Sequence, residues 1–498
     1  MRIACYGDAV RVRHLSPAEV AASLDFSVEA LARSHPELSA RQLFERRWRK
    51  VIVGIIVLIA VLLLLDPLTT AIGLLSVLVA VYVAVTVNRI VLFFKSQDKD
   101  ALCRVSPEEA RSTPDHQLPV YTVLVPAYQE PEVIGSLIRH LEALEYPRDK
   151  LDVKLLLEED DDETVAAVHD ANPPDYFELV LVPPAEPRTK PKALNFALAF
   201  AQGSVLTIYD AEDQPDPLQL RRAAFVLGRT DERIACVQAK LSFANSDQNM
   251  ITRWFTLEYT MWFELFLPGL SALKAPIPLG GTSNHFRVDV LRSLGAWDPS
   301  NVTEDADLGI RLARHGYQCE VLDSTTLEEA NSDFVNWVKQ RSRWYKGYLQ
   351  TAIVHLRRLR TSARELGPLG LVELVLFVLG TPVLALLNTV FWAMTAMWFA
   401  FHPQVIRELF PAPLFYPAVL SWVLGNFTIV YLHILTCRLL KRFDLTTAAV
   451  LVPMYWIMMA LAAAKATWQL FAAPTFWEKT THGLAQISID TSTDGPKG

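Results

Sequence analysis

The sequence lacks several features that would place it in a familiar class of protein. Its five cysteines show no C-x-x-C spacing, which argues against a structural zinc site or a disulfide framework and fits a reducing compartment. A formal net charge of -7 without a basic stripe argues against nucleic acid as a partner. Residues 1–47 lack the apolar stretch of a cleavable signal peptide. They are expected to form a cytoplasmic segment, in which Ser16-Pro17-Ala18-Glu19 predicts a helix start.

Long apolar runs, by contrast, are plentiful. Hydrophobic residues make up 51% of the 498 residues, too many for an ordinary soluble enzyme. Residues 51–65 and 68–87 predict a membrane-spanning hairpin. Basic residues flank both outer ends of this hairpin, including Arg89 and Lys95, so the positive-inside rule places these ends in the cytoplasm. We therefore expect an integral plasma (inner) membrane protein with a cytoplasmic catalytic domain.

Three further apolar runs, residues 369–401, 414–437 and 446–471, predict C-terminal membrane helices. The first contains Pro382 and predicts either one kinked helix or a re-entrant pair, so the number and parity of crossings stay open. Polar residues that interrupt these runs are expected to face protein or water, and they are Asn388, Asn426, His433 and Lys465. The predicted organisation is a segment at 1–47, a hairpin at 48–95, a domain at 96–367, membrane helices at 368–474, and an interfacial segment and tail at 475–498.

The predicted domain alternates short β-rich runs with helical patterns. This alternation indicates βαβ units and a mostly parallel sheet. Ligands bind beyond the carboxyl ends of the strands in such sheets, and polar residues follow three of the predicted strands. The predicted strands are residues 121–125, 151–157, 179–182 and 205–209.

Two acidic strings carry candidate chemistry. Asp210-Ala-Glu212-Asp213 follows a predicted strand, and hard divalent ions such as Mg²⁺ take one or two protein carboxylates with phosphate and water oxygens. Asp305, after Thr303-Glu304, lies near a predicted helix N-terminus, whose dipole favours an ionised carboxylate suited to a general base. A solvated acidic surface is the simpler alternative for the first string, and above all for the longer acidic cluster at residues 158–163.

Gln340-Arg-Ser-Arg343-Trp344 lies on a predicted helix just before the chain turns apolar. Gln340, Arg343 and Trp344 share one helix face, because positions three and four apart are neighbours. Arg binds a diphosphate in a bidentate manner, and Trp stacks on a sugar ring. Interfacial helices also use Arg and Trp as membrane anchors, so this string alone is weak.

Taken in order, these strings resemble the membrane-embedded members of glycosyltransferase family 2, the group of bacterial cellulose, mannan, curdlan and hyaluronan synthases. The resemblance implies a Rossmann-like α/β domain of GT-A type between transmembrane helices. Seven strings in the family's order are a stronger signal than any single one. They are Val125-Pro126-Ala127-Tyr128-Gln129-Glu130, residues 158–163, Lys190-Pro191-Lys192-Ala193-Leu194-Asn195, residues 210–213, Gly280-Gly281-Thr282-Ser283-Asn284-His285, Thr303-Glu304-Asp305, and residues 340–344.

The resemblance also implies roles for individual residues. Donor binding is implied for Tyr128, Glu130, Glu159, Asp160, Lys190, Lys192, Asp210 and Arg343. Acceptor binding is implied for Gly281, Thr282, Ser283, His285, Gln340 and Trp344. Asp210, Glu212 and Asp213 would hold Mg²⁺ or Mn²⁺, and Asp305, beside Glu304, would deprotonate the acceptor. Residues 477–483 resemble the segment that returns to the cytoplasmic side after the membrane helices in such synthases.

Two departures from the family pattern leave assignments open. The metal motif usually reads Asp-x-Asp, whereas this chain has Asp-x-Glu followed by Asp213, so the second metal ligand is not fixed. The nucleoside-binding acid usually sits in an Asp-Asp pair, whereas Glu159, Asp160 and Asp161 compete for that role here, with Asp160 slightly favoured.

The predicted function is an inverting, metal-dependent glycosyltransferase that extends a β-linked polysaccharide at the cytoplasmic membrane face and exports it. Its expected partners are a UDP- or GDP-sugar, a glycan or lipid acceptor, membrane lipid and an accessory export subunit. Two alternatives remain: transfer of one sugar to a lipid, and a catalytically inactive membrane scaffold or export component.

Overall fold

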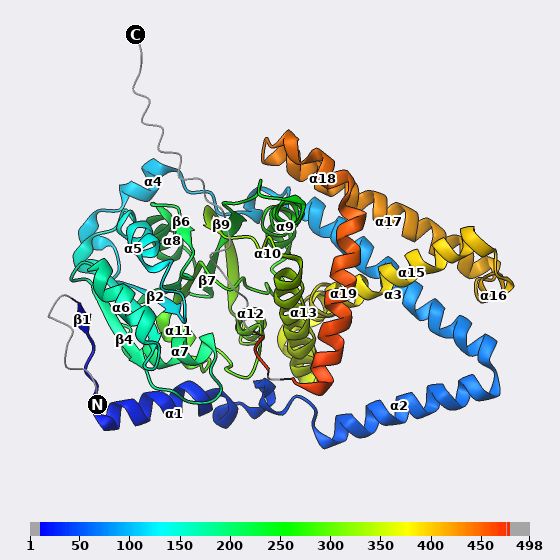
Figure 1. Ribbon diagram of the computed structural model, residues 1–498, viewed down its shortest axis with the longest axis horizontal. Coiled ribbons are helices and arrows are strands. Elements are labelled where there is room, and N and C mark those ends of the chain that lie inside the picture. Colours follow the sequence, from blue (N-terminus) through cyan, green and yellow to red (C-terminus); the bar gives the residue numbers. More distant parts are fainter. Residues whose placement is uncertain (1–9, 475, 479–498) are drawn as a thin grey trace, which may run out of the picture.

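The computed structural model describes residues 10–474 and 476–478, and a nine-stranded sheet lies at its centre (Figure 1). The strand order is β1-β4-β3-β2-β5-β8-β7-β9-β6. The first five strands in this order run parallel, whereas β8 is antiparallel to both neighbours and β6 is antiparallel to β9. The strands are β1 (Arg11–Val12), β2 (Tyr121–Ala127), β3 (Leu151–Glu158), β4 (Phe177–Val182), β5 (Val205–Ile208), β6 (Gln214–Pro215), β7 (Ile234–Phe243), β8 (Asn284–Arg287) and β9 (Gln318–Glu328).

The predicted α/β domain is therefore confirmed, but its sheet is mixed rather than mostly parallel. The four strands predicted from the sequence form the parallel half. Strand β8 follows a helical segment of the chain. It lies between β5 and β7 and runs antiparallel to both. The domain helices are α4 (Pro107–Ser112), α5 (Ile134–Glu142), α6 (Asp162–Ala171), α7 (Lys190–Leu198), α8 (Gln219–Arg229), α9 (Met250–Met261), the π-helix η6 (Trp262–Phe266), α10 (Leu267–Ala272), α11 (Val288–Ser293), α12 (Glu304–Arg314) and α13 (Phe334–Leu356).

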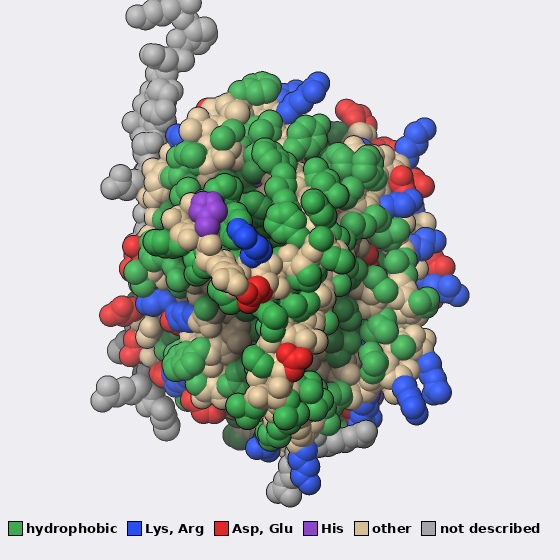
Figure 2. All heavy atoms as spheres, turned by 90° about the vertical axis from the view of Figure 1, so that its right-hand side faces the viewer, with side chains coloured by type: hydrophobic (Ala, Val, Ile, Leu, Met, Phe, Trp, Pro, Cys, Tyr) green, Lys and Arg blue, Asp and Glu red, His purple; other side chains and the backbone are tan. Residues whose placement is uncertain are grey.

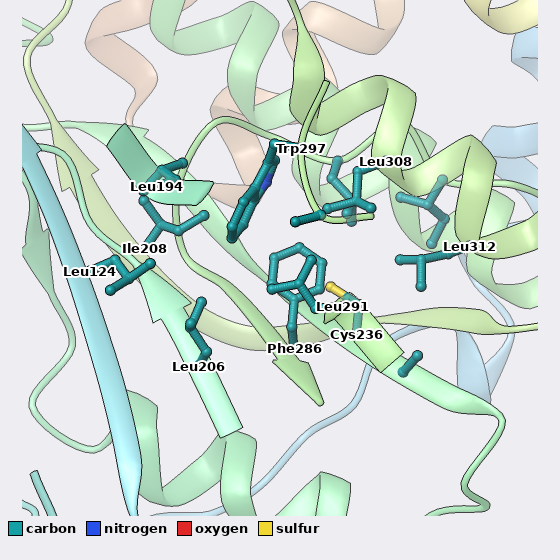
Figure 3. Packing of buried hydrophobic residues seen from close by; sticks show 14 of the residues in the cluster. Leu124, Leu194, Leu206, Ile208, Cys236, Phe286, Leu291, Trp297, Leu308 and Leu312 are labelled. Carbon is teal, nitrogen blue, oxygen red and sulfur yellow. The ribbon is translucent and has the colours of Figure 1, made fainter. Parts of the chain in front are cut away.

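Both faces of the sheet are covered, which explains why its parallel strands are apolar at successive positions. In β2, Val123 and Val125 point into a core formed with α5 and α8, whereas Leu124 points into the opposite core. That opposite core contains Trp297, which is fully buried and packs edge-on against Phe286 of β8 (Figure 3). Helices α7, α11 and α12 add the leucines of this core, so the start of α12 is held against the sheet.

The N-terminal segment packs on the domain as part of its fold. Strand β1 extends the sheet beside β4, and α1 (Pro17–Ser34) lies against α7. The predicted helix start is confirmed, because Ser16 and Glu19 form a reciprocal capping box. After α1, Arg357 donates hydrogen bonds to the carbonyl oxygens of residues 36, 37, 39 and 42. These bonds tie residues 36–42 to the end of α13.

Apolar helices extend from one side of the domain (Figure 1). Among the described residues, four helices are long and apolar enough to cross a membrane, and the bent pair α18–α19, with a 60° angle, makes a fifth if counted as one span. The end of the molecule on the right of Figure 1 shows mainly hydrophobic side chains, with most charges toward its rim (Figure 2). The helices outside the domain are α2 (Arg46–Leu65), α3 (Pro67–Lys95), α14 (Leu359–Glu373), the π-helix η7 (Leu374–Leu379), α15 (Gly380–Phe401), α16 (Gln404–Leu409), α17 (Ala412–Leu439), α18 (Thr446–Val450) and α19 (Val452–Ala472).

The structure adds detail to two of the predicted apolar segments. Helices α2 and α3 meet at Asp66-Pro67 and diverge from that turn, so the predicted hairpin is splayed (Figure 1). The segment around Pro382 is one continuous helical run from η7 into α15. Proline lacks an N–H group and leaves a carbonyl one turn earlier without its helical partner, and a π-turn relieves that local mismatch.

Gly309→Ala is expected to lower the free energy of unfolding by about 1–3 kcal/mol, the usual cost of overpacking. A Cβ atom at this position in α12 would lie 2.0 Å from the carbonyl oxygen of Ile277, which is backbone and cannot rotate away. Thermal unfolding of the detergent-purified protein measures the change. The matched control is Gly228→Ala in α8, where nothing lies within 4 Å of an added Cβ. Equal unfolding temperatures for the two variants would contradict the close packing of α12.

Candidate active site

A cavity of ≈ 480 Å³ lies at the carboxyl ends of β2, β3 and β5, bordered by α12 and α13. The chain reverses direction at these strand ends, so side chains from distant motifs converge there. Most of the predicted site residues line this cavity, namely Tyr128, Glu130, Lys190, Asp210, Glu212, Gly281, Glu304, Asp305, Gln340, Arg343 and Trp344. The other predicted residues lie behind the cavity or at its edge.

The acidic residues that follow β3 lie in different environments. Glu158 lines the cavity, whereas Glu159 and Asp160 are exposed and do not. Asp160 instead forms a 2.6 Å ion pair with Arg188, which lines the cavity and is hydrogen-bonded to Tyr128. Arg188 therefore separates Asp160 from the cavity, and the donor-binding role of Asp160 stays a prediction.

The two predicted lysines occupy different environments. Lys190 ion-pairs with Asp210 and donates a 2.8 Å hydrogen bond to the carbonyl oxygen of Gly281. Burial alone would lower the pKa of Lys190, but the charges of Asp210 and Glu304 raise it above its ordinary value. Lys192 is fully buried and pairs with Glu158 at 2.7 Å, outside the cavity. Lys190 is therefore the lysine placed to meet a ligand.

The turn after β5 presents two carboxylates to the cavity, those of Asp210 and Glu212. Asp213 points away and is fully buried, with one oxygen accepting a 2.8 Å hydrogen bond from the Asp210 N–H and another from the Thr282 hydroxyl. Its other oxygen has no partner among the described residues. Burial, with the charges of Asp210 and Glu212, raises the pKa of Asp213. Asp213 therefore shapes the turn, and its metal role stays a prediction.

The carboxylates of Asp210 and Glu212 fit a hard divalent cation. No group of three or more His, Cys, Asp or Glu suited to a metal occurs in residues 10–474 and 476–478. Mg²⁺ and Mn²⁺ sites in phosphate-binding enzymes commonly use one or two carboxylates and complete the shell with phosphate and water oxygens. Two carboxylates facing a cavity of this size match that arrangement.

Glu304 and Asp305 form the first turn of α12 and face the cavity. Burial raises the pKa of Asp305 to about 6, and burial together with the charge of Asp305 raises that of Glu304 to about 8. One oxygen of Asp305 accepts a 2.7 Å hydrogen bond from the Ala306 N–H. The other lies 3.3 Å from where a Cβ on Gly281 would sit, so only glycine leaves space beside it. Asp305 thus has a free oxygen and a raised pKa, as a general base requires.

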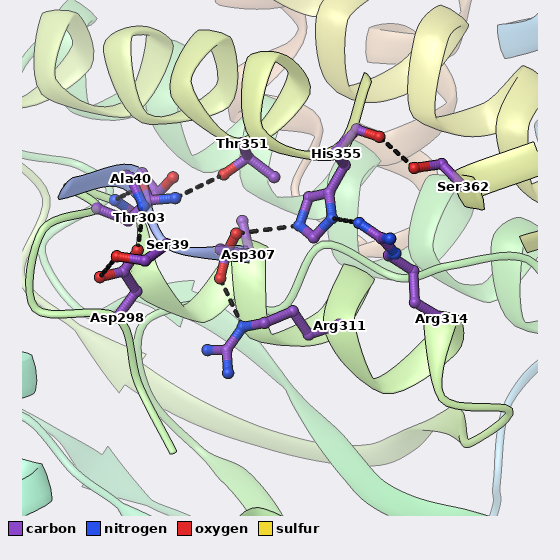
Figure 4. A network of polar contacts seen from close by, with 12 residues as sticks. Ser39, Ala40, Asp298, Thr303, Asp307, Arg311, Arg314, Thr351, His355 and Ser362 are labelled. Atoms are coloured by element: carbon purple, nitrogen blue, oxygen red, sulfur yellow. Dashed lines mark hydrogen bonds and ion pairs between the residues drawn. The ribbon is translucent and has the colours of Figure 1, made fainter. Parts of the chain in front are cut away.

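A buried polar network holds α12 against α13 (Figure 4). Asp307 accepts from Arg311 at 2.7 Å and contacts Nε2 of His355 on α13 at 3.0 Å. Arg314 lies 3.1 Å from Nδ1 of the same ring, and because arginine only donates, Nδ1 accepts and Nε2 carries the proton. Asn301 adds a 3.0 Å bond to Thr351. The first turn of α12 and α13 are therefore joined by buried hydrogen bonds.

Helix α13 brings Gln340, Arg343 and Trp344 to the cavity on one face, as predicted from their spacing. Among the described residues, none forms an ion pair or hydrogen bond with the Arg343 guanidinium, which lies 4.5 Å from the ring centre of Trp477. Trp344 stacks on Tyr259, with ring centres 6.0 Å apart. A Cβ on Gly347 would lie 2.3 Å from the Thr303 hydroxyl oxygen, so this glycine allows α13 to approach α12.

Three residues predicted to bind an acceptor lie inside the sheet. The Thr282 hydroxyl oxygen lies 3.0 Å from the carbonyl oxygen of Ile208, and Ser283 is bonded to Thr326 at 2.7 Å. His285 is fully buried, its Nδ1 lies 2.6 Å from the Tyr121 hydroxyl, and burial lowers its pKa to about 3. Thr282 and Ser283 lead into β8, and His285 lies in it. Because β8 is paired on both sides, it holds these side chains away from the cavity. Of this motif only Gly280 and Gly281 line the cavity.

The sequence did not single out several cavity residues. Glu258, Tyr259 and Glu328 come from α9 and β9, which have no recognised motif around them. Burial raises the pKa of Glu328 well above its ordinary value. Arg341 lies inside the Gln340–Trp344 string, yet it pairs with Glu258 at 2.9 Å rather than remaining free for a ligand. Of the predicted return segment, Trp477 lines the cavity and residues 479–483 lie outside the described residues.

The central part of the chain is similar to known proteins. Residues 118–347 match the family described as Glycosyltransferase like family 2. The chain is 30% identical over 238 residues to Probable glycosyltransferase YdaM of Bacillus subtilis (strain 168), which covers 46% of this chain and 56% of that protein. It is 28% identical over 239 residues to Beta-monoglucosyldiacylglycerol synthase of Trichormus variabilis, covering 47% and 50%. It is 26% identical over 287 residues to Glucomannan 4-beta-mannosyltransferase 1 of Oryza sativa subsp. japonica, covering 53% and 52%.

The chain spans about half the length of these curated relatives. Among solved structures, it is similar to a mannosyltransferase from Pyrobaculum calidifontis in complex with GDP-Man and Mn²⁺. The TM-score is 0.51 at 21% sequence identity, over 79% of this chain and 99% of that one. This likeness in fold confirms the predicted GT-A-type α/β domain flanked by apolar helices.

Lys192→Gln is expected to lower the free energy of unfolding by about 3 kcal/mol, the lower end of the range for breaking a buried ion pair. The change leaves Glu158 without its partner at the cavity wall. Thermal or denaturant unfolding measures it. Arg188→Gln is the matched control, because it breaks an exposed pair and should leave the unfolding temperature nearly unchanged. Wild-type stability in Lys192→Gln would instead favour a direct ligand-binding role for this lysine.

Proposed function

We propose, on the premise that residues 118–347 are a glycosyltransferase family 2 domain, that the protein transfers a sugar from a nucleotide-sugar donor to an acceptor hydroxyl at a membrane face. The observation that carries the proposal is the cavity in which Asp210, Asp305 and Arg343 converge from three separate motifs. Such a transfer needs a general base, carboxylates that face the cavity and a cation that is available to the diphosphate.

The donor would lie along the strand ends. Tyr128 and Glu130 border the end where a nucleoside fits, with Arg188 beside them. Arg343 lines the cavity, and its guanidinium forms no ion pair or hydrogen bond with any described residue, so it is suited to the diphosphate. Asp210 and Glu212 would hold Mg²⁺ or Mn²⁺, which supplies charge stabilisation for the leaving diphosphate. Whether UDP or GDP carries the sugar depends on contacts to the base.

Asp305 would act as the base in a single displacement. Its free oxygen accepts the proton of the acceptor hydroxyl as that oxygen attacks the anomeric carbon from the face opposite the diphosphate. The bond to the diphosphate breaks, so the configuration at the anomeric carbon inverts. Gly281 leaves open space beside this carboxylate, and Trp344 borders the same cavity with Gln340.

Two acceptor classes are compatible with this chemistry. Elongation of a β-linked glycan, coupled to export through the helices or an accessory subunit, follows from the order of the motifs. Transfer of one sugar to a lipid is the second class. The cavity between the apolar helices is only ≈ 70 Å³, which is small for a chain of sugar rings. The names of two relatives, a glucomannan mannosyltransferase and a glucosyldiacylglycerol synthase, represent one class each.

Nucleoside-diphosphate release by the purified protein tests the proposal. With Mg²⁺ or Mn²⁺ present, one of UDP-glucose, UDP-N-acetylglucosamine and GDP-mannose is expected to release its nucleoside diphosphate, and chelation of the metal to stop it. Asp305→Asn should reduce the rate by about 10²–10⁴-fold, the usual worth of a general base. Asp289→Asn is the matched control, because Asp289 is also in a helix first turn but is exposed away from the cavity. Failure of all donors to bind or react would favour the inactive scaffold.

The reaction is expected to lose rate in acid. Asp305 must be ionised to accept a proton, and burial raises its pKa to about 6. Because the protonated form dominates below that value, kcat/KM should fall about tenfold for each unit below pH 6 and level off above it. A pH profile with saturating metal measures this. A rate that is flat through pH 6 would exclude Asp305 as the base.

A further inference from the structure

A second cavity, of ≈ 70 Å³, lies between the apolar helices and adjoins the first. The two cavities share the lining residues Glu258, Trp262, Tyr345 and Thr381. Helices α3, α15, α17 and α19 supply most of its wall. One molecule can therefore occupy both cavities if it passes between these four residues.

One face of α3 carries polar groups into this cavity. Tyr82, Thr86 and Arg89 are spaced by four and three residues, so they share that face. The Tyr82 hydroxyl is satisfied by Asn388 at 3.5 Å and Asn426 at 3.3 Å. Arg89 has no such partner: its guanidinium lies over the Phe266 ring and forms no hydrogen bond or ion pair with any residue that the structure describes.

Every other cation around the two cavities except Arg343 is paired. Arg188 pairs with Asp160, Lys190 with Asp210, and Arg341 with Glu258. Glu258, whose charge also acts on Arg89 without a direct contact, is already paired with Arg341 through both oxygens and accepts a further 2.7 Å hydrogen bond from Tyr455. Unpaired charges among membrane helices are costly and mark sites that receive a partner. Two unpaired cations therefore indicate two anions: the donor diphosphate at Arg343 and another at Arg89.

The depth of Arg89 indicates where the second anion comes from. Arg89 lies six residues before the end of α3 at Lys95, or about 9 Å along the helix axis. The headgroup layer of a bilayer is about 5–8 Å thick on each side, so Arg89 lies just beneath that layer if Lys95 marks the water side. A lipid phosphate held by Arg89 would therefore lie at the inner edge of the headgroup layer. The cavity of ≈ 70 Å³ is small, which suits a single polar group such as a phosphate and not a chain of sugar rings.

We propose that the second cavity binds the phosphate of a membrane lipid that serves as the acceptor, with Arg89 as the residue that recognises it. The proposal rests on the proposed function and narrows its acceptor to a phosphate-bearing lipid with a free hydroxyl. The phosphate at Arg89 holds the lipid while its hydroxyl reaches past Trp262 and Tyr345 toward Asp305. The transfer then forms a glycosidic bond to that hydroxyl and releases the nucleoside diphosphate, with the proton passing to Asp305.

Binding of two matched lipids to the full-length protein tests the site. Phosphatidylglycerol and diacylglycerol both carry a free hydroxyl and two acyl chains, but only the first carries a phosphate. Native mass spectrometry of the protein in mixed micelles measures each affinity. Wild-type protein is expected to prefer phosphatidylglycerol by at least about tenfold, the worth of one charge-assisted hydrogen bond. Arg89→Gln should remove this preference, and Arg89→Lys should retain part of it because the charge remains.

Controls separate this site from general charge and from folding. Lys95→Gln removes a positive charge from the same helix but outside both cavities, and it should bind as wild type does. Donor affinity and unfolding temperature should be unchanged in Arg89→Gln. Equal binding of the two lipids by wild type, or an unchanged preference in Arg89→Gln, would overturn the site.

Product analysis tests the acceptor role. Glycosylated phosphatidylglycerol is expected from wild type, with its KM raised at least about tenfold in Arg89→Gln at an unchanged donor KM. Glycosylation of diacylglycerol or of a growing glycan in preference to phosphatidylglycerol would overturn the acceptor assignment. Lipid binding at Arg89 without release from any donor would instead defeat the proposed transferase activity, because the binding measurement does not depend on turnover.

Discussion

The fully buried carboxylate of Asp307 fixes the relation between α12 and α13, the two helices that border the main cavity. It joins Arg311 on its own helix to His355 on α13, and Arg314 completes the network from the other side of the ring. Removing one partner of such a group leaves an uncompensated charge in the interior, so the whole arrangement is held together. Asp305 at the start of α12 and Arg343 on α13 therefore keep one geometry, and Gly347 allows the helices to approach at that point.

The charges around the cavities follow a consistent pattern. Carboxylates outnumber cations at the strand ends, and most cations there already have a carboxylate partner. Burial and mutual repulsion raise the pKa of Glu304 and that of Glu328. A divalent cation and a diphosphate entering together suit such a site, because the metal offsets the carboxylates while the phosphates meet the free guanidinium of Arg343.

The N-terminal segment and the apolar helices are joined to the same centre. Arg357, at the end of α13, holds the backbone of residues 36–42, and Asp298 accepts a 2.6 Å hydrogen bond from the Ala40 N–H. Burial raises the pKa of Asp298 to about 6. On the opposite side, the Arg341–Glu258–Tyr455 cluster links α13 to α9 and α19. Helix α13 thus contacts both the N-terminal segment and the apolar helices.

The sequence by itself determined the parallel half of the sheet, the apolar helices and the residues of the cavity that belong to recognisable strings, because periodicity and local spacing are encoded over a few residues. Gln340, Arg343 and Trp344 share a face simply because of helical geometry. Only the tertiary structure decided which members of each string meet the cavity. Lys192, Asp213, Thr282 and Ser283 lie one or two residues from cavity residues and His285 lies four residues from Gly281, yet strand pairing and burial turn them away. Arg341 is paired, whereas Arg89 has no ion-pair partner among the described residues. Both outcomes depend on residues that are distant in sequence, because a charged side chain pairs with whatever lies beside it in space.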